Sequence, residues 1–284
     1  MFLCFTDLDG TLLNHDDYQY DVAVPTIKTL RAAGVPVMPT TSKTKAEVSD
    51  LRSALGLGDP FIVENGSGVF FEINDPRFDF QRVAQVATDH TTLVASPETL
   101  TLGVTYEEAR QGLRKLSVET GETLRGFGDL TLADLEAATG LSAEAISKAC
   151  DRQFSEPFIR PETSIQTLEA IAQELGFKIL VGNRFCHLLG AGAAKGLAVQ
   201  LVAKAWQLAH DGDEKITTVG LGDSPNDLSM LEAVDVAIVV PGVKGPHPDL
   251  KPYIEKYGWQ VAPDTGCRGW AAAVEAAIAE HLPS

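Results

Sequence analysis

The chain begins with a short apolar run that ends in two acids, Phe2-Leu3-Cys4-Phe5-Thr6-Asp7-Leu8-Asp9-Gly10-Thr11-Leu12. A run of this length that ends in a glycine turn is typical of a buried β-strand. In open α/β sheets, ligands bind just past the carboxyl ends of the strands. Burying two neighbouring carboxylates is costly unless a cation or a reaction requires them. Asp7 and Asp9 therefore predict a functional site at a strand end rather than a solvated turn.

A second strand of the same kind lies near the other end of the chain and runs into Gly222-Asp223-Ser224-Pro225-Asn226-Asp227. Between the two strands, Gly190-Ala191-Gly192-Ala193-Ala194-Lys195-Gly196 places a lysine near an expected helix start. Thr41-Ser42-Lys43 supplies hydroxyls and another cation after a further short strand. Because the carboxyl ends of parallel strands meet at one edge of a sheet, we expect these four turns to converge in one cleft.

Strands and helices alternate in both terminal regions. After the opening strand, the hydrophobic pattern predicts helices at 24–33, 46–55, 195–209 and 226–233, and strands at 35–38, 61–63, 216–221 and 236–240. A strand at 69–73 is expected to return as a hairpin through Gly66-Ser67-Gly68. This alternation predicts the α/β class, with a doubly wound parallel sheet.

The middle of the chain has a different pattern. Short β-like runs at 91–95, 158–160 and 177–181 are mixed with polar helices expected at 105–119, 142–153 and 164–175. This mixture favours an α+β insert with its own small core. We therefore expect a catalytic core formed by 1–82 and 184–284, with an α+β cap inserted at 83–183.

The composition restricts location and partners. The 284 residues are 44% hydrophobic, which supports a sizeable core, and the formal net charge of −16 disfavours nucleic acid or an anionic membrane as a partner. The sequence has neither a membrane-length apolar run nor a basic segment before the first strand, which predicts a cytoplasmic protein. Its four cysteines form no C-x-x-C pair, so we expect reduced thiols and no zinc site. Cys4 is expected to lie in the core.

The predicted cleft gathers four acids, two lysines and several hydroxyls. Such oxygen ligands suit Mg²⁺, which binds proteins through a few carboxylates together with substrate phosphate. Phosphoryl transfer requires positioning and charge neutralisation, and this set of side chains supplies both. Local cations are also needed to overcome the repulsion between an anionic substrate and the acidic chain.

With these motifs, the sequence resembles the phosphatases of the haloacid dehalogenase superfamily that carry a type IIB cap. Asp7-Leu8-Asp9-Gly10-Thr11 matches the first motif of the superfamily and Thr41 the second. Lys195 matches the third, and Gly222-Asp223 with Asn226-Asp227 matches the fourth. The matches cover both halves of the expected core in the right order.

Further segments resemble the mannosyl-3-phosphoglycerate phosphatase subgroup. They are Thr41-Ser42-Lys43-Thr44, Pro60-Phe61-Ile62-Val63-Glu64-Asn65-Gly66, Gly126-Phe127-Gly128-Asp129-Leu130, and Arg184-Phe185 followed by His187. Near the carboxyl terminus, Thr265-Gly266-Cys267-Arg268-Gly269-Trp270 keeps the Gly-Trp pair of the subgroup but lacks its proline.

The resemblance implies a role for each core residue. Asp7 is expected to attack phosphorus and form an aspartyl-phosphate, while Asp9 protonates the leaving alcohol and later deprotonates water. Thr41 would donate a hydrogen bond to the phosphoryl group. Lys195 would neutralise the phosphoryl group and Asp7, the alternative being a surface lysine at a helix start.

The same resemblance implies that Mg²⁺ is held by Asp7, the Asp9 carbonyl group and Asp223. Asp227 is expected to contribute directly or through water, and it also fits a helix N-terminal acid. Residues expected to contact substrate are Ser42, Lys43, Arg152, Glu156, Arg184, His187 and Asn226. For Lys43 simple solvation is an alternative, and for His187 a hydrogen-bonded histidine at a domain seam.

The implied function is Mg²⁺-dependent hydrolysis of mannosyl-3-phosphoglycerate to mannosylglycerate and phosphate. The partner is then a small phosphorylated sugar-glycerate, and we expect a monomer or a weak homodimer. Enzyme alternatives act on glucosyl-3-phosphoglycerate, sucrose phosphate or general hexose phosphates, and a mutase also stays open. Alternatives from other classes are a phospho-acceptor signalling module and a catalytically silent sugar-phosphate binding protein.

Overall fold

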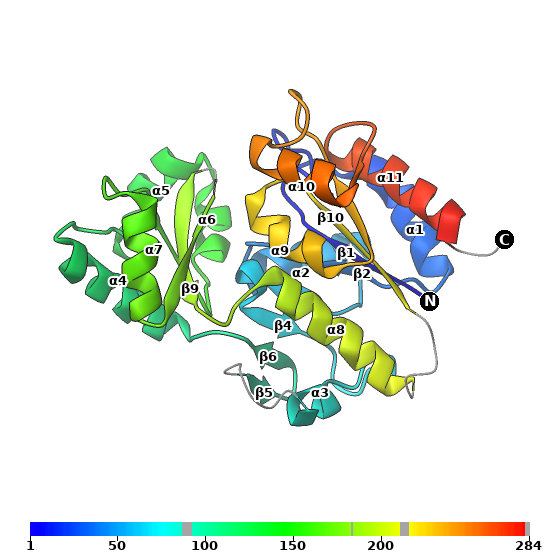
Figure 1. The fold of residues 1–284 in the computed structure, drawn as a ribbon, viewed down its shortest axis with the longest axis horizontal. Helices are drawn as coiled ribbons and strands as arrows, with labels where there is room; N and C mark the ends of the chain where they lie inside the picture. Colours follow the sequence, from blue (N-terminus) through cyan, green and yellow to red (C-terminus); the bar gives the residue numbers. More distant parts are fainter. Residues whose placement is uncertain (87–92, 183, 211–215, 282–284) are drawn as a thin grey trace.

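The computed structural model describes residues 1–86, 93–182, 184–210 and 216–281 (Figure 1). The chain forms a larger α/β unit built from both terminal regions and a smaller unit built from the middle region. Each unit has its own sheet and its own cluster of buried apolar side chains.

The sheet of the larger unit has five parallel strands in the order β12-β11-β10-β1-β2. These strands are β12 (Gln260–Val261), β11 (Val236–Val239), β10 (Thr217–Gly222), β1 (Phe2–Thr6) and β2 (Val37–Pro39). The opening strand thus lies between two neighbours, and all its residues are buried. A strand covered on both faces has no polar side, which explains its continuous apolar sequence.

Helices cover both faces of this sheet, which confirms the predicted doubly wound arrangement. On one face, Phe2 and Cys4 pack with α1 (Val24–Ala32) and α11 (Gly266–His281). On the other, Leu3 and Phe5 pack against α8 (Lys195–Ala209), whose bounds are those expected from the sequence. Alternate residues of β1 therefore serve two separate apolar layers.

A second, antiparallel sheet extends the larger unit in the order β3-β4-β6-β5. Its strands are β3 (Phe61–Val63), β4 (Gly68–Phe70), β6 (Thr99–Thr101) and β5 (Val94–Ser96). A parallel bridge between Thr40 and Ile62 places β3 next to the end of β2. The expected hairpin between β3 and β4 is present.

The smaller unit is the predicted α+β insert. Its antiparallel sheet has the order β7-β9-β8, with β7 (Glu156–Ile159), β9 (Phe185–Gly190) and β8 (Phe177–Val181). The helices are α4 (Tyr106–Thr120), α5 (Leu132–Thr139), α6 (Ala143–Ala149) and α7 (Ile165–Glu174). The helix expected at 142–153 already ends at Ala149, because residues 152–155 turn back and bond to the larger unit.

Two segments beside the expected domain boundaries pack differently from the expectation. Val83 and Leu100 lie in one apolar cluster with Leu3 and Phe5, since β6 hydrogen-bonds to β4 and α3 (Phe80–Val86) contacts α8. Strand β9, in contrast, lies within the sheet of the smaller unit. We propose that the boundaries fall near residues 103 and 190. In the strand expected at 91–95, residues 91 and 92 lie outside the described residues, and β5 begins at Val94.

The remaining elements complete the larger unit, apart from η3 in the smaller one. They are α2 (Lys45–Leu55), α9 (Leu228–Ala233), α10 (Lys251–Tyr257), η1 (Asp21–Ala23), η2 (Glu64–Gly66), η3 (Phe127–Asp129), η4 (Pro225–Asp227) and η5 (Pro248–Leu250). All four cysteines are free thiols, and Cys4 is buried in the core as predicted. Within the described ranges, no helix is both long enough and apolar enough to cross a membrane.

Gly66 allows a close contact between the two halves of the larger unit, and this contact predicts a stability effect. Its φ is +87°, and a Cβ atom there would lie 2.2 Å from the carbonyl carbon of Ala194, the residue before Lys195. Gly66→Ala is therefore expected to lower the free energy of unfolding by about 3 kcal/mol or more, since it combines a left-handed backbone with a backbone clash.

Gly34→Ala is the matched control, because Gly34 has a φ of +70° and open space around its Cβ position. The control should lose only about 1–2 kcal/mol from backbone strain. Equilibrium urea unfolding measures both losses. Equal losses for the two variants would show that the contact at Ala194 has no energetic weight.

Candidate active site

A buried lysine joins two acids at the centre of the site. Lys195 Nζ lies 2.7 Å from Asp7 Oδ1 and 2.6 Å from Asp227 Oδ1. Lys195 is the first residue of α8, where the helix dipole disfavours a positive charge. Burial also lowers the pKa of Lys195, but the Asp227 and Asp7 carboxylates outweigh burial and hold that pKa above its ordinary value. The lysine therefore stays charged inside the protein.

Asp227 uses its second oxygen to shape the turn after β10. Its Oδ2 accepts hydrogen bonds from the backbone N–H groups of Asp223 (3.0 Å) and Ser224 (3.2 Å). The carboxylate thus closes the turn of η4, which matches the N-terminal acid considered from the sequence. With one oxygen on Lys195 and the other on the turn, Asp227 orients Asp223.

Three acids form a group that suits a divalent cation. One carboxylate oxygen from each of Asp7, Asp223 and Asp227 lies within 4.8 Å of the others. Among the described residues, Asp223 Oδ1 is buried without a hydrogen-bond partner. Burial, and then the charges of Asp227 and Asp7, raise the pKa of Asp223 well above its ordinary range. An unpartnered oxygen in an excess of negative charge fits the oxygen coordination of Mg²⁺.

Gly10 allows Asp223 to approach the opening turn. The φ of Gly10 is +81°, and a Cβ atom there would lie 2.7 Å from Asp223 Oδ2. A side chain at this position would occupy the space beside the carboxylate group that fits the cation.

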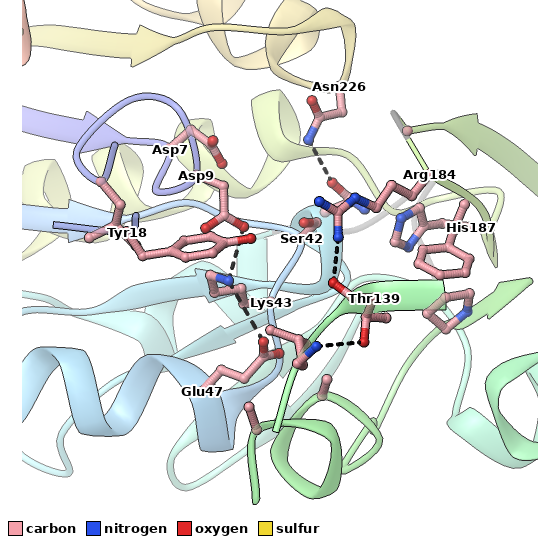
Figure 2. A pocket seen from close by; sticks show the side chains of 18 of the residues that line it. Asp7, Asp9, Tyr18, Ser42, Lys43, Glu47, Thr139, Arg184, His187 and Asn226 are labelled. Carbon is pink, nitrogen blue, oxygen red and sulfur yellow. Dashed lines mark hydrogen bonds and ion pairs between the residues drawn. The ribbon is translucent and has the colours of Figure 1, made fainter. Parts of the chain in front are cut away.

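Asp9 lies apart from the three-acid group and faces a different cation. Its Oδ2 is 2.9 Å from Lys43 Nζ, which also lies 3.7 Å from Glu47 Oε1 (Figure 2). Burial alone lowers the pKa of Lys43, but the Asp9 and Glu47 carboxylates hold it above its ordinary value. Asp9 and Lys43 both line the cavity, so the pair can meet a bound molecule. The carboxylate of Asp9 is thus free of the metal group.

The backbone of the opening turn is anchored by the carboxyl-terminal helix. Trp270 is fully buried and donates from Nε1 to Thr6 Oγ1 at 2.9 Å. The Thr6 hydroxyl group in turn donates to the carbonyl oxygen of Asp7 at 2.7 Å. Trp270 received no role in the site in the sequence analysis, although Gly269-Trp270 is the pair that the sequence shares with the phosphatase subgroup.

Thr41 follows β2 and is buried at the same edge of the sheet. Its N–H donates to the carbonyl oxygen of Ile62 at 3.0 Å, and its Oγ1 accepts from the N–H of Lys43 at 3.2 Å. These bonds fix the turn that carries Ser42 and Lys43 toward the cavity.

A cavity of about 640 Å³ lies between the two units. Asp7, Asp9 and Asp223 line it from the larger unit, and helices α5 and α6 and strand β9 contribute the opposite wall. This volume lies within the ordinary range for pockets that bind small molecules. The site residues thus open onto a space that both units enclose.

Most of the residues expected to contact substrate line this cavity. They are Ser42, Lys43, Arg152, Arg184, His187 and Asn226. Arg184 Nη1 donates to the carbonyl oxygen of Thr139 at 2.6 Å, and Asn226 Nδ2 donates to Asn65 Oδ1 at 3.3 Å (Figure 2). These bonds leave part of each polar side chain available to the cavity.

Glu156 is not brought to the cavity. Its carboxylate is fully buried in the smaller unit, where Oε1 accepts from Arg110 Nη1 and from the N–H of Gly128, each at 3.0 Å. The position of Glu156 at the start of β7 turns its side chain toward α4 and η3. This geometry assigns Glu156 to the internal structure of the insert.

Two adjacent residues that sequence reasoning left out of the site belong to its surroundings. Asn65 lines the cavity and bonds to Asn226. Glu64 is fully buried and accepts hydrogen bonds from residues 153–155 of the insert. Both belong to the Glu64-Asn65-Gly66 run. This motif was identified in the sequence analysis, but its contacts were not predicted.

His187 is held in its neutral form. Its Nδ1 is buried without a hydrogen-bond partner in the described part of the chain. Burial, and then the positive charges of Arg152 and Lys195, lower the pKa of His187 to about 3. The ring therefore offers the cavity a neutral donor and acceptor.

The lowered pKa of His187 predicts that its ring stays neutral at mildly acidic pH. Between its ordinary pKa of 6.5 and about 3, the unfolded chain binds a proton at this ring that the folded protein excludes. Its contribution to folding stability therefore falls as the pH falls through this window. Ring nitrogen chemical shifts in ¹⁵N NMR, assigned with His187→Gln, should show a neutral ring at pH 5. A titration midpoint near pH 6 would contradict the burial and charge that we describe.

Comparisons with known proteins identify the family of the chain. A family model described as haloacid dehalogenase-like hydrolase matches residues 4–91. The chain is 39% identical over 268 residues to a glucosyl-3-phosphoglycerate/mannosyl-3-phosphoglycerate phosphatase of Persephonella marina, with 94% of this chain and 93% of the relative covered. A relative with the same name from Methanococcoides burtonii is 32% identical over 240 residues, with 84% of each chain covered.

A solved structure supports the same fold, including the insert. A sugar phosphatase of subclass IIB of the haloacid dehalogenase superfamily matches with a TM-score of 0.63, over 99% of this chain and 98% of that one, at 14% identity. The chain therefore shares the fold of that structure over nearly its whole length, and the smaller unit is called the cap from here on. The chain belongs to the haloacid dehalogenase-like hydrolases, and within that family it is a phosphoric monoester hydrolase.

Proposed function

We propose that the protein is a Mg²⁺-dependent phosphatase that hydrolyses mannosyl-3-phosphoglycerate to mannosylglycerate and inorganic phosphate. The observation that carries the proposal is the placement of Asp7. Its carboxylate lies 2.7 Å from the Lys195 ammonium group, beside Asp223, and faces a cavity shared with the cap. A carboxylate held by a buried cation at the mouth of a cavity is poised to receive a phosphoryl group.

In the first proposed step, a carboxylate oxygen of Asp7 attacks phosphorus. The bond between phosphorus and the glycerate oxygen breaks, and Asp9 gives its proton to that oxygen. In the second step, water attacks phosphorus of the aspartyl-phosphate while Asp9 takes a proton from the water. This step breaks the bond between phosphorus and Asp7, releases phosphate, and restores the Asp7 carboxylate and the protonated Asp9.

The protein holds these groups with little freedom. Lys195 neutralises Asp7 and the transferring group, and Thr41 donates its hydroxyl hydrogen to a phosphoryl oxygen. Asp7, Asp223 and the Asp9 carbonyl group would hold Mg²⁺, with Asp227 contributing through water. The bound ion would supply the charge neutralisation that lets one anion approach another. Both oxygens of Asp227 already accept hydrogen bonds, which supports a role through water.

Cap residues and the volume of the cavity support a substrate larger than a simple phosphate ester. Arg152, Arg184 and His187 from the cap, with Ser42, Lys43 and Asn226 from the core, provide polar groups for a sugar and a carboxylate. The relatives are named for both the glucosyl and the mannosyl ester, so glucosyl-3-phosphoglycerate is the second candidate. We propose a cytoplasmic location and a monomer or weak homodimer.

Replacement of the proposed nucleophile gives a sharp prediction. Asp7→Asn should lower phosphate release from mannosyl-3-phosphoglycerate by at least about a thousandfold, because an amide cannot form the aspartyl-phosphate. Asp249→Asn changes an exposed acid that does not line the cavity and should keep the wild-type rate. Circular dichroism checks that both variants fold. A folded Asp7→Asn variant with near wild-type turnover would remove Asp7 as the nucleophile.

A panel of phosphate esters tests the substrate. Mannosyl- and glucosyl-3-phosphoglycerate should give much higher kcat/KM than sucrose phosphate or hexose phosphates. Release should depend on added Mg²⁺ and cease with EDTA. Similar kcat/KM across all sugar phosphates would contradict a sugar-glycerate assignment but leave the phosphatase chemistry intact.

Metal binding should also be visible without turnover. At a Mg²⁺ concentration one hundred times its Kd, the free energy of unfolding should rise by about 2.7 kcal/mol, because the ion binds only the folded site. Thermal unfolding with and without Mg²⁺ measures this gain. Asp223→Asn should reduce it strongly, whereas an unchanged gain in this variant would place the ion elsewhere.

A further inference from the structure

We propose that Glu64 is a positioning residue that ties the cap to the core and fixes Arg152 at the wall of the cavity. The inference rests on the proposed function only in its choice of substrate. Glu64 comes from η2 in the core, directly after β3, yet its carboxylate bonds to a cap segment.

The backbone at Glu64 is strained. Its φ is +49°, and Asn65 follows at +59° and Gly66 at +87°. Glutamate rarely adopts this left-handed region, and such strain persists where the surroundings enforce it. Here Glu64 N–H donates to the carbonyl oxygen of Lys43 at 3.0 Å, and Asn65 N–H donates to that of Thr41 at 2.9 Å. The turn that presents Glu64 is thus bonded to the turn that carries Lys43.

The carboxylate of Glu64 is fully buried and accepts from three groups of the cap. These are the N–H of Gln153 at 2.8 Å, the N–H of Phe154 at 3.2 Å, and the hydroxyl group of Ser155 at 2.6 Å. Hydrogen bonds to a buried ionised acceptor are stronger than neutral ones. One core side chain therefore accepts the hydrogen bonds of three polar groups in a single turn of the cap.

The same turn holds Arg152. Its Nε lies 3.4 Å from Glu64 Oε2 and donates to the carbonyl oxygen of Ser155 at 3.1 Å. Its Nη2 donates to Ser155 Oγ at 2.9 Å and to the carbonyl oxygen of Ser42 at 3.2 Å. Within the described ranges, Nη1 makes no hydrogen bond, and Arg152 lines the cavity.

These contacts divide the guanidinium group into two parts. The edge bearing Nε and Nη2 is fixed by Glu64, Ser155 and Ser42, while Nη1 remains for a ligand. A guanidinium nitrogen in this setting suits an anionic oxygen. Glu64 balances the buried charge of Arg152 and orients its free nitrogen toward the anionic part of a substrate in the cavity.

The test compares Glu64→Gln with wild type on two substrates. For mannosyl-3-phosphoglycerate we expect KM to rise about tenfold with kcat within about threefold, because a neutral acceptor holds Arg152 less firmly. For p-nitrophenyl phosphate, which carries neither a sugar nor a carboxylate, both constants should stay within about twofold. A purely structural role would change both substrates alike.

Glu122→Gln is the matched control. Glu122 likewise accepts from two backbone N–H groups and a hydroxyl group, those of Glu162 and Thr163, but it does not line the cavity. Its KM values should equal those of wild type. Equal KM increases for the two substrates in Glu64→Gln would overturn the proposal. So would a KM increase for mannosyl-3-phosphoglycerate alone in Glu122→Gln.

If Glu64→Gln fails to fold, Ser155→Ala takes its place. This variant must raise KM for mannosyl-3-phosphoglycerate and not for p-nitrophenyl phosphate, and equal KM changes for the two substrates would overturn the proposal.

Hydrogen exchange separates this inference from the proposed function. The N–H groups of Gln153 and Phe154 should exchange at least about tenfold faster in Glu64→Gln and at the wild-type rate in Glu122→Gln, since only the former loses their ionised acceptor. This measurement needs no substrate. If wild type fails to hydrolyse sugar-glycerate esters, the proposed function is wrong, while faster exchange in Glu64→Gln still supports the link between cap and core through Glu64. Unchanged exchange in Glu64→Gln overturns this link whatever the substrate.

Discussion

The charge balance around Lys195 is the constraint on which the rest of the structure depends. A lysine at the start of α8 is held between Asp7, directly after β1, and Asp227, in η4 after the neighbouring β10. Neither acid nor the lysine is stable in the interior without the others, because removing one partner leaves an uncompensated buried charge. The cluster therefore fixes the register of residues far apart in sequence. The addition of Asp223 leaves an excess of negative charge, which a divalent cation would offset.

The two units have different tasks in this arrangement. The proposed chemistry belongs to the core, where strand ends, α8 and the Trp270–Thr6 hydrogen bond hold the acids in place. We propose that the cavity wall formed by the cap selects the substrate. Glu64 links the two units. Its backbone bonds to the turn that carries Lys43, and its carboxylate bonds to the cap segment that carries Arg152. A cap tied at this point can present its polar groups to a substrate without disturbing Asp7.

Sequence reasoning predicted the core well because its signals are local. Strand β1 is covered on both faces and so reads as an apolar run, and acids at strand ends mark the ligand edge of a parallel sheet. The turns that carry Lys195 and Asp227 were expected to converge at this edge, but the ion pairs of Lys195 with Asp7 and Asp227 were not predicted. We propose different boundaries for the cap because β5 and β6 are short strands, and their pairing with β4 depends on tertiary contacts that the sequence does not reveal. Glu156 and Glu64 look alike in sequence, and only the fold decides that one bonds inside the cap and the other bridges the units.

The central claim is transfer of the phosphoryl group to Asp7, and trapping that species tests it most directly. Acid quenching during turnover, followed by peptide mass spectrometry, should find a phosphoryl group on Asp7 in the wild-type protein. No such label should form in Asp7→Asn. A phosphoryl group on Asp9, or steady phosphate release with no labelled carboxylate under conditions that preserve acyl phosphates, would contradict the account.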